Sequence, residues 1–360
     1  MKKSLIALAL LGATAASAQA ADVSVYGTVD AGVKYLRNAD AAQEKLTNSF
    51  KLGSGIADGN KLGFKGSEAI GQHYHVGFQL ETGFDLANGQ LNDSKKLFDR
   101  EARVFVNGVF GELSIGRMGA LGSAKGTYDI FFANADAFDG GDQLGTFFNV
   151  SETLDNAVTY ATPEVAGVKG YVQYSFAQDA DQENKFDKNN RFWAVGATFN
   201  QDNFGLTAVV EQTIPSNAPE AKFTQKSTTV SLGGNVKLDN IAIFAGAQYA
   251  KNPHNLSIFN SDLDQKIYED DQKSPFKHNV AFTLGSSIDL NNSNIMVAGY
   301  TGHAKINEKH IHGYGLSARY KYNLSTRTSL YAGVDGSTFK ARHIDATKLA
   351  SVYAGMTHNF

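Results

Sequence analysis

The sequence predicts an all-β fold, a 16-stranded antiparallel transmembrane β-barrel. Three observations favour it. Apolar and polar residues alternate along most of the chain, the connections come in two lengths, and 36 glycines, 24 phenylalanines and 15 tyrosines accompany only 5 prolines. Such strands can present one face to lipid and the other to water. A soluble β-sandwich would share this composition, but it has no reason to sort its connections by length.

The first twenty residues are expected to be an export signal. Lys2 and Lys3 precede an apolar run, and a small-residue cleavage site follows at 18–20. This run is too short and wrongly flanked for a membrane helix, and no later stretch reaches the ~18 apolar residues that a spanning helix needs. We therefore expect a signal peptide at 1–20 and one domain at 21–360, with any membrane span made of strands.

Charge and cysteine content narrow the function. Removing Lys2 and Lys3 from 33 basic residues leaves 31 against 36 acidic ones, a net of about −5. This mild acidic balance argues against nucleic acid as a partner. The chain has no cysteine, so neither a disulfide framework nor a thiolate metal site is available. A closed, hydrogen-bonded barrel is the expected source of stability.

The first expected strand, 23–35, places Val25 and Val29 on an apolar face and Asp30 and Lys34 on the opposite, polar face. Its length is unusual for a soluble strand and suits a tilted bilayer crossing. We expect Asp30 and Lys34 to face a wet lumen. Similar alternation continues without a domain boundary at 61–65, 75–81, 98–108, 110–117, 168–176, 193–199, 206–210, 230–238, 241–249, 280–288, 295–301, 314–322, 330–334 and 352–360.

Seven short turns and eight long polar connections join sixteen expected strands. The short turns carry Gly, Asn, Asp, Pro or Ser and lie near Ser67, Gly108, Glu164, Asp202, Asp239, Asn292 and Ser325. The long connections cover 38–55, 85–96, 118–150, 178–190, 212–225, 251–277, 302–308 and 337–347. Short turns at one rim and long loops at the other are typical of an outer-membrane barrel with both termini on the short-turn side.

The connection at 118–150 has a distinctive composition. It holds six glycines, five phenylalanines, one base (Lys125) and four acids: Asp129, Asp136, Asp139 and Asp142. A compact domain seldom keeps so long an irregular connection unless that connection has a function. We hypothesise that it lies inside the barrel opposite a basic wall. Alternatively, the four acids only keep the segment soluble.

Several stretches resemble the general porins of Gram-negative bacteria, in particular the neisserial and betaproteobacterial group. They are VYGTVDAG at 25–32, NKLGFKGSE at 60–68, FQLETGF at 78–84, FGELSIGR at 110–117, DNAVTY at 155–160 and the terminal Phe360. They span essentially the whole mature chain, in family order. The resemblance implies a homotrimer in the outer membrane, whose water-filled channels pass ions and small hydrophilic solutes by passive diffusion.

In such porins the third external loop folds inward, so the connection at 118–150 is expected to fold into the barrel. Outer-membrane lipid and lipopolysaccharide are expected around the barrel. The terminal Phe360 resembles the signal that the barrel-assembly machinery reads.

The resemblance also implies a constriction, with a basic cluster on the wall opposite the acidic loop. The matching basic positions are Lys61, Lys65, Arg100 and Arg117. Arg103 departs from the family, which has a large uncharged residue there. Arg100 and Arg103 have opposite parity on a regular strand, so both face the lumen only if Arg100 belongs to the rim. We favour Arg100 and keep Arg103 as its rival.

Each of these assignments has a plainer alternative. Lys61 and Lys65 would be ordinary solvated charges on a wet face, and Arg117 would be a structural partner of a loop or subunit. Relatives often carry an arginine just before the Asp-Asn pair at 155–156, where this chain has the sequence Glu-Thr-Leu at 152–154. Ion preference is therefore not predicted.

Other chemistry finds little support in the sequence. His310-Ile311-His312 places two imidazoles on one strand face, but no third metal ligand lies nearby in sequence. No Ser, His and Asp arrangement stands out as a triad, so we expect no enzyme, cofactor or metal. Two alternatives remain open. A substrate-specific channel would need extra strands or an aromatic slide, and a barrel adhesin or enzyme would leave 118–150 outside the pore.

Overall fold

The computed structural model describes residues 23–40, 45–139, 147–178, 186–218, 221, 223–254, 256, 276–306, 309–341 and 344–360. The expected export signal at 1–20 and the loop acid Asp142 lie outside these residues. None of the helices in the described ranges is both long and apolar enough to cross a membrane.

The described residues form seventeen strands, one short α-helix and one 3₁₀ helix. The strands are β1 (Ser24–Asp40), β2 (Lys45–Ser54), β3 (Lys61–Ile70), β4 (Tyr74–Gly83), β5 (Glu101–Gly108), β6 (Gly111–Gly119), β7 (Thr153–Ala161), β8 (Val168–Ser175), β9 (Arg191–Gln201), β10 (Phe204–Ile214), β11 (Ser227–Leu238), β12 (Ile241–Lys251), β13 (Phe276–Leu290), β14 (Ser293–Ile306), β15 (Lys309–Asn323), β16 (Thr328–Ala341) and β17 (Ile344–Asn359). The helices are α2 (Phe132–Ala135) and η4 (Phe186–Lys188).

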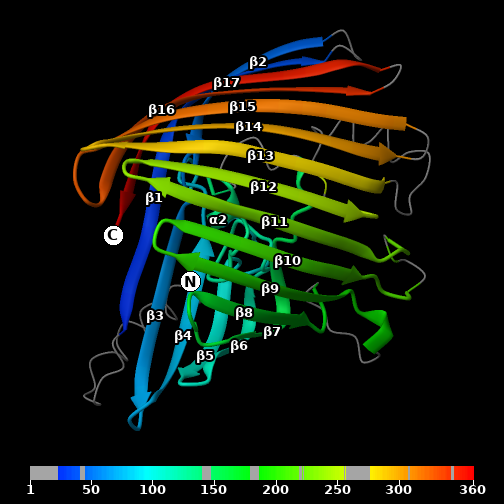
Figure 1. The fold of residues 1–360 in the computed structure, drawn as a ribbon. Coiled ribbons are helices and arrows are strands. Elements are labelled where there is room, and N and C mark those ends of the chain that lie inside the picture. The colour runs from blue at the N-terminus through cyan, green and yellow to red at the C-terminus, as the bar shows by residue number, and fades with distance from the viewer. Residues whose placement is uncertain are drawn as a thin grey trace, which may run out of the picture.

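The strands close into a barrel, which Figure 1 shows from the side. From β3 to β17 each strand pairs antiparallel with the next along the chain, and β17 returns to pair with β1. Phe360 lies at this seam, where its backbone exchanges two hydrogen bonds of 3.1 Å with Gly27. Both edges of every described strand except β2 are paired, and a closed set of strands is the condition for crossing a bilayer with a sheet.

Seventeen strands fill only sixteen positions around the barrel, as expected from the sequence. The reason is that β2 and β3 share one position beside β1. The upper part of β1 pairs with β2, from Ala31 opposite Ser54, and its first residues pair with β3, from Ser24 opposite Lys65. Residues 55–60 interrupt this shared strand. The sequence predicts a loop over 38–55, and this prediction is wrong for 45–54, because these residues extend the β1 ladder.

Asp30 organises the interruption between β2 and β3. Its Oδ1 accepts hydrogen bonds from the backbone N–H of Ile56 at 2.7 Å and from the hydroxyl of Tyr331 at 2.8 Å. Its Oδ2 accepts one from Thr357 at 2.5 Å, and its backbone N–H donates to the side chain of Asn60. Asp30 therefore faces inward as expected, but it is fully buried rather than wet.

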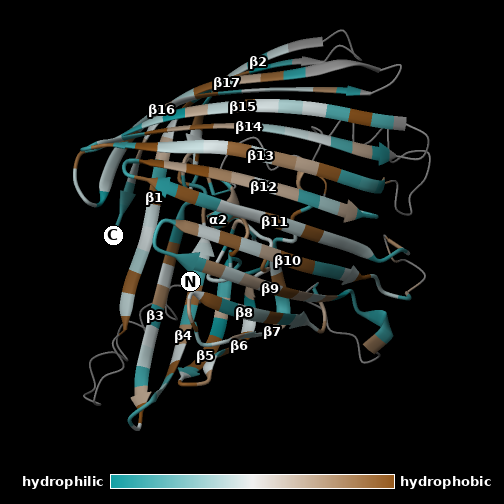
Figure 2. Cartoon of the chain, in the orientation of Figure 1, coloured by the Kyte–Doolittle hydropathy of each residue, from teal (hydrophilic) through white to brown (hydrophobic). Residues whose placement is uncertain are grey.

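The two faces of the strands differ as the alternation predicted. Outward positions carry exposed apolar side chains such as Val33, Leu284, Leu316 and Val352, and intervening positions turn to the interior. Figure 2 shows the resulting interleaving of hydrophobic and hydrophilic residues along the strands. The exposed residues Val352 and Met356 of β17, and Phe360 just after it, lie on the lipid side, as the sequence indicated.

Several of the expected turns have the chemistry that the sequence indicated. Asp202, Asp239 and Asn291 adopt positive φ values of 43°, 51° and 50°, a conformation that Asp and Asn tolerate better than most side chains. Two of the expected long connections are mainly strand. Ile306 pairs with Lys309 and Ala341 with Ile344, so β14–β15 and β16–β17 extend through most of 302–308 and 337–347.

Candidate functional site

The connection after β6 packs against the inner face of the barrel. Leu121, Phe131 and Phe148 are fully or almost fully buried, and α2 contacts β10, β11 and β12. Phe131, Phe132 and Phe148 form a cluster with ring centroids 4.9–5.8 Å apart. This aromatic cluster anchors the connection by hydrophobic burial.

Small residues on the wall make room for this packing. A Cβ placed on Gly233 would lie 2.4 Å from the side chain of Ala135 in α2, and one on Gly302 would lie 2.2 Å from the ring of Phe147. Real atoms do not approach so closely. The glycines therefore allow the connection to lie directly on the strands.

Polar contacts tie the connection to the same wall. The hydroxyl of Tyr300 donates to Asp136 at 2.9 Å, and the Asn279 amide donates to the carbonyl of Phe147 at 2.6 Å. The backbone N–H of Asn149 donates to the Gln248 side chain at 2.6 Å. These bonds satisfy backbone and carboxylate groups that burial would otherwise leave unpaired.

Arg103 joins the start of the connection to β5 and its neighbours. Its guanidinium lies 3.2 Å from the carboxylate of Glu101 and 3.0 Å from that of Glu112, and it donates to Ser114 at 2.7 Å. It also reaches the hydroxyl of Tyr128 in the connection at 3.4 Å. Only 6 % of Arg103 is exposed, so most of its charge is neutralised inside this network.

Arg100 also reaches the interior, so the choice between Arg100 and Arg103 as the inward residue does not arise. Strand β5 begins at Glu101, so Arg100 precedes the strand and the parity rule does not apply to it. Its Nε lies 2.5 Å from Glu81, which also accepts a hydrogen bond from the hydroxyl of Tyr26 at 2.9 Å. Both arginines therefore lie on the inner side of the β4–β6 wall.

The two lysines predicted for the basic wall lie on β3. Lys61 forms a long ion pair of 3.5 Å with Asp58, in the interruption before β3. Lys65 is exposed, and its ammonium lies 5.1 Å from the centre of the Tyr26 ring. Because Lys61 and Lys65 share the parity of Gly63, which contacts Tyr26, both point inward.

Arg117 lies beside the segment that precedes Arg100, and its guanidinium binds Asp99 and Asp155 rather than Glu81. Its Nε donates to the carbonyl of Asp99 at 2.7 Å, and it forms an ion pair with Asp155. Lys96 binds the second oxygen of the same carboxylate at 2.6 Å. The structure thus brings Arg117, Lys96 and Asp155 together at the rim.

The described loop acids have different surroundings. Asp136 is buried against Tyr300, and Asp139 is exposed. Asp129 accepts a hydrogen bond from the N–H of Phe132 at 3.1 Å at the start of α2. Burial raises the pKa of Asp129 well above the usual carboxyl range, and the negative charge and hydrogen bond of Asp139 raise it further. Asp129 and Asp139 thus face each other, and Asp129 holds a proton at neutral pH.

Two groups of inward charges were missed or underused in the sequence analysis. A polar cavity of about 650 Å³ is lined by residues that include Lys34, Lys51, Asp85 and Asp335. Lys51 lies on β2, within the range 38–55 that the sequence predicts to be a loop. On β1 and β2, Lys34 pairs directly opposite Lys51, so two ammonium groups line this cavity.

Arg319 is the second omission. It is buried, it donates to the carbonyl of Ala57 in the β2–β3 interruption at 3.3 Å, and its guanidinium lies 4.9 Å from the ring centre of Phe138. It therefore connects the interruption to the inner loop. Alternation could have found it, because the exposed neighbours Leu316 and Tyr320 place Arg319 on the inner face of β15.

A closed barrel whose inner face carries arginines, lysines and an acidic loop matches a known family. The family model described as Gram-negative porin matches residues 7–342. An outer membrane porin protein of Bordetella pertussis is 27 % identical over 397 residues, covering 100 % of both chains. Outer membrane porin protein 32 of Delftia acidovorans is 30 % identical over 372 residues, covering 99 % of this chain and 95 % of the relative.

Solved structures share the fold. An anion-selective porin from Comamonas acidovorans has a TM-score of 0.68 at 18 % identity, covering 95 % of this chain and 100 % of that one. OmpT of Vibrio cholerae in its trimer form has a TM-score of 0.66 at 14 % identity, with coverage of 95 % and 100 %. The chain therefore belongs to the Gram-negative porin family, and its barrel is located in the outer membrane.

Proposed function

We propose that the protein is a water-filled channel through which ions and small hydrophilic solutes diffuse passively. The observation that carries the proposal is a closed barrel whose inner face is polar and charged and whose outer face is apolar. Membership of a family of outer-membrane porins supports it. A channel needs no catalytic group, and the proposal includes no enzymatic activity.

Reconstitution tests this function. Purified protein in a planar bilayer should give stable conductance steps that increase with salt concentration. A barrel that acted only as an adhesin or an enzyme would fold and insert without such steps. Absence of conductance from correctly folded protein would reject the proposal.

We propose that the loop after β6 forms one side of the constriction and the β3–β6 wall the other. Lys61, Lys65 and Arg100 supply the positive side, with Arg100 paired to Glu81, while Arg103 is neutralised by Glu101 and Glu112 and positions the loop. Asp139 supplies the accessible negative charge, because Asp136 is buried and Asp129 is protonated. In this proposal Arg117 stabilises the rim through Asp155. Asp142 has the chemistry to join Asp139.

Reversal potentials under a salt gradient test this constriction. Asp139→Asn should shift selectivity toward anions, and Arg100→Gln should shift it toward cations, because each removes one fixed charge from the path. Lys237→Gln, at an exposed position near the opposite rim, is the matched control and should leave the potential unchanged. Equal potentials for the wild type and both site variants would contradict the assignment.

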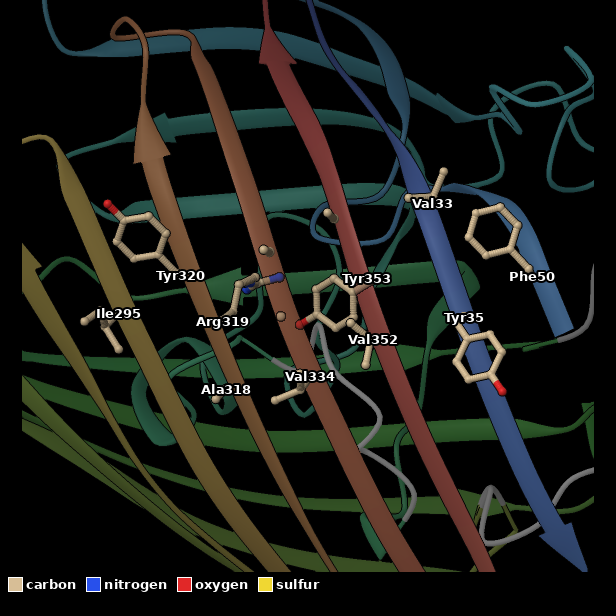
Figure 3. Close-up of a pocket in the computed structure, with 13 residues that line it drawn as sticks. Val33, Tyr35, Phe50, Ile295, Ala318, Arg319, Tyr320, Val334, Val352 and Tyr353 are labelled. Carbon is tan, nitrogen blue, oxygen red and sulfur yellow. The ribbon is translucent and has the colours of Figure 1, made fainter. Parts of the chain in front are cut away.

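We further propose a homotrimer, with one apolar depression on the outer face as part of the contact between copies. Figure 3 shows this depression, of about 560 Å³, across β1, β2 and β14–β17. Small residues form its floor, including Ala332, Gly333 and Ala354, and Tyr35 and Phe50 flank it. The trimer form of a structural neighbour supports the proposal.

Filling the depression tests the trimer. Ala332→Trp should shift the protein from trimer to monomer in detergent, as measured by native mass spectrometry. Leu284→Trp, on the exposed outer face of β13, is the control and should remain trimeric. A monomeric wild type, or a trimeric Ala332→Trp variant, would argue against this interface.

A further inference from the structure

Four histidines gather on the outer face of the barrel, near the ends of β14 and β15 at Ile306 and Lys309. The Nε2 of His303 and the Nδ1 of His310 are 2.8 Å apart. The rings of His303 and His312 stack with centroids 4.3 Å apart and planes 20° apart, and His278 lies 6.1 Å from His303. The sequence indicated only His310 and His312 as a pair, and the strand register adds the other two.

Lysines extend the cluster on both sides. Lys251 pairs opposite His278, Lys305 opposite both His278 and His310, and Lys340 opposite His312. Lys277 is exposed beside them at a register shift. We call the set the histidine belt, and it consists of Lys251, His278, His303, Lys305, His310, His312 and Lys340.

The belt has a single sign of charge. The outward positions next to it on the described strands are Tyr249, Val280, Thr301, Tyr314 and Thr338, and none of these described positions carries a carboxylate. Seven cationic or ionisable groups thus face outward together. A concentration of positive charge attracts anions.

The belt lies at one boundary of the apolar surface. Along β15 the outward residues change from His310 and His312 to Tyr314 and then to Leu316, with Tyr314 and Leu316 exposed to 65 % and 64 %. Charge, then an aromatic ring, then an aliphatic chain is the order that a membrane surface requires from headgroup to hydrocarbon. The belt therefore lies at the depth of lipid headgroups.

The rim that carries the belt also identifies the leaflet. The belt lies at the rim that carries the long connection between β12 and β13, at the opposite ends of these strands from the turns at 239–240 and 291–292 and from Phe360. In an outer-membrane barrel this rim faces outward from the cell. The outer leaflet there consists largely of lipid whose headgroup carries phosphate groups.

A metal ion does not fit the cluster as it stands. Two nitrogen ligands on one zinc ion at 2.0–2.1 Å would be roughly 3.3 Å apart in a tetrahedral site, whereas the contact between His303 and His310 is a hydrogen bond of 2.8 Å. The described residues include no group of three or more ligands placed to hold a metal. Protons and anions are the better match.

We propose that the histidine belt is a docking site for the phosphate groups of outer-leaflet lipid, and that it binds them more tightly as the pH falls. Imidazoles gain positive charge between about pH 8 and about pH 5. The hydrogen bond between His303 and His310 uses one nitrogen of each ring, and the other nitrogen of each ring can donate to a phosphate oxygen when it carries a proton. Protonated imidazoles and lysines then make charge-assisted hydrogen bonds to phosphate.

The size of the effect follows from the number of added charges. Each positive charge near an anionic lipid surface strengthens binding roughly fivefold. One or two additional protons on the belt therefore predict an increase of roughly 5- to 25-fold on acidification. The phosphate groups lose some negative charge over the same pH range, so the ratio of affinities must be compared between variants.

Binding to purified lipid A in mixed micelles provides the test, with the full chain in detergent and dissociation constants measured at about pH 5.5 and about pH 8. The affinity ratio is the dissociation constant at the higher pH divided by that at the lower pH. In the variant with His303→Gln, His310→Gln and His312→Gln this ratio should be at least about fivefold smaller than in the wild type. The variant with His73→Gln and His75→Gln, two exposed histidines near the opposite rim, should keep the full ratio.

Two further measurements keep the proposal open to refutation. Lys305→Gln with Lys340→Gln should weaken binding at both pH values and leave their ratio unchanged, because lysine stays charged throughout. Dephosphorylated lipid A should bind weakly and without pH dependence. An unchanged ratio in the triple histidine variant, equal binding of dephosphorylated lipid, or full displacement by inorganic phosphate would each overturn lipid docking.

Discussion

Asp129 and Asp139 of the inner loop differ in charge at neutral pH, although they are only ten positions apart. Burial and the charge of Asp139 raise the pKa of Asp129, so Asp129 is neutral at neutral pH and becomes charged only in alkaline solution. Asp139 remains exposed beside it. The charge of the loop is therefore smaller than its sequence indicates, and it increases when Asp129 loses its proton.

Neutralising each acid in turn should show this difference. At neutral pH, Asp129→Asn should leave the reversal potential almost unchanged, because it replaces one neutral group by another. Asp139→Asn should shift the potential toward anion selectivity. In alkaline solution the wild type should become more cation-selective than Asp129→Asn at the same pH. Equal shifts for the two variants at neutral pH would be inconsistent with a protonated Asp129.

Arg103 has a structural role that a positive charge alone would not require. Its guanidinium binds two carboxylates and reaches Tyr128 of the loop, and Glu101 beside it is fully buried. Replacement by methionine would leave Glu101 without its ion pair, at a cost of about 3–5 kcal/mol in the free energy of unfolding. The planar fork of arginine explains why lysine is a poor substitute.

Urea unfolding in detergent micelles measures this prediction. Arg103→Met should lower the midpoint clearly, while Arg37→Met, which removes an exposed arginine on the outer side of β1, should not. Equal midpoints for these two variants would show that Arg103 is dispensable for stability.

At the scale of elements, close approach between the loop and the wall depends on glycine. A side chain at Gly302 would occupy the space of the Phe147 ring close to its backbone, so the ring cannot simply turn aside. Gly299 lies on the outer side of the same strand, where the nearest atom to an added Cβ is the flexible tip of Leu316 at 3.2 Å. The two positions form a matched pair.

Gly302→Val should therefore displace the loop from β14 at a cost of about 1–3 kcal/mol in packing. We expect larger or noisier single-channel currents from the displaced loop. Gly299→Ala should conduct like the wild type. Identical currents from Gly302→Val, in protein shown to be folded by its gel mobility, would show that the loop does not determine conductance.

The elements differ in how far the sequence could predict them. Alternation identified the strands and their faces because residues on a lipid-facing strand must alternate, and Asp30 and Lys34 do point inward. The strand β2 was missed because it pairs only with β1 above the interruption at Asp30, and its sequence is polar enough for a loop. The sequence overestimates the length of the connections at 302–308 and 337–347, most of which is strand. Strand residues above the membrane do not need an apolar face, so alternation no longer identifies them.

Site prediction was limited by pairing between distant residues. The sequence identified Arg100, Arg103 and the loop acids as candidates, but nothing local could show that Arg117 meets Asp155 or that Asp136 meets Tyr300. The raised pKa of Asp129 also depends on how the loop folds back, because burial and the nearby Asp139 cause it. Arg319 illustrates this limit. Alternation along β15 predicts that its side chain points inward, but it does not predict the contact with Ala57.

At the scale of the whole molecule, one chain has to satisfy three environments. Its mid-strand outward positions are apolar, its inner positions are polar or packed against the loop, and the histidine belt borders the apolar surface on one side. Closure through β1 and β17 lets all three coexist, because residues along each strand alternate between the inner and the outer face and β12–β16 carry the belt at one end. The channel depends on the loop after β6 remaining inside this closed wall.

The absence of cysteine allows a direct measurement of that arrangement. Asp139→Cys introduces a unique thiol on the loop, and Glu164→Cys introduces one on an exposed turn after β7 as the control. Modification with a positively charged thiol reagent should reduce the single-channel conductance of Asp139→Cys and shift its reversal potential toward anions, with no change for Glu164→Cys. Complete modification of Asp139→Cys, verified by mass, with conductance and reversal potential unaltered would contradict a constriction formed by this loop.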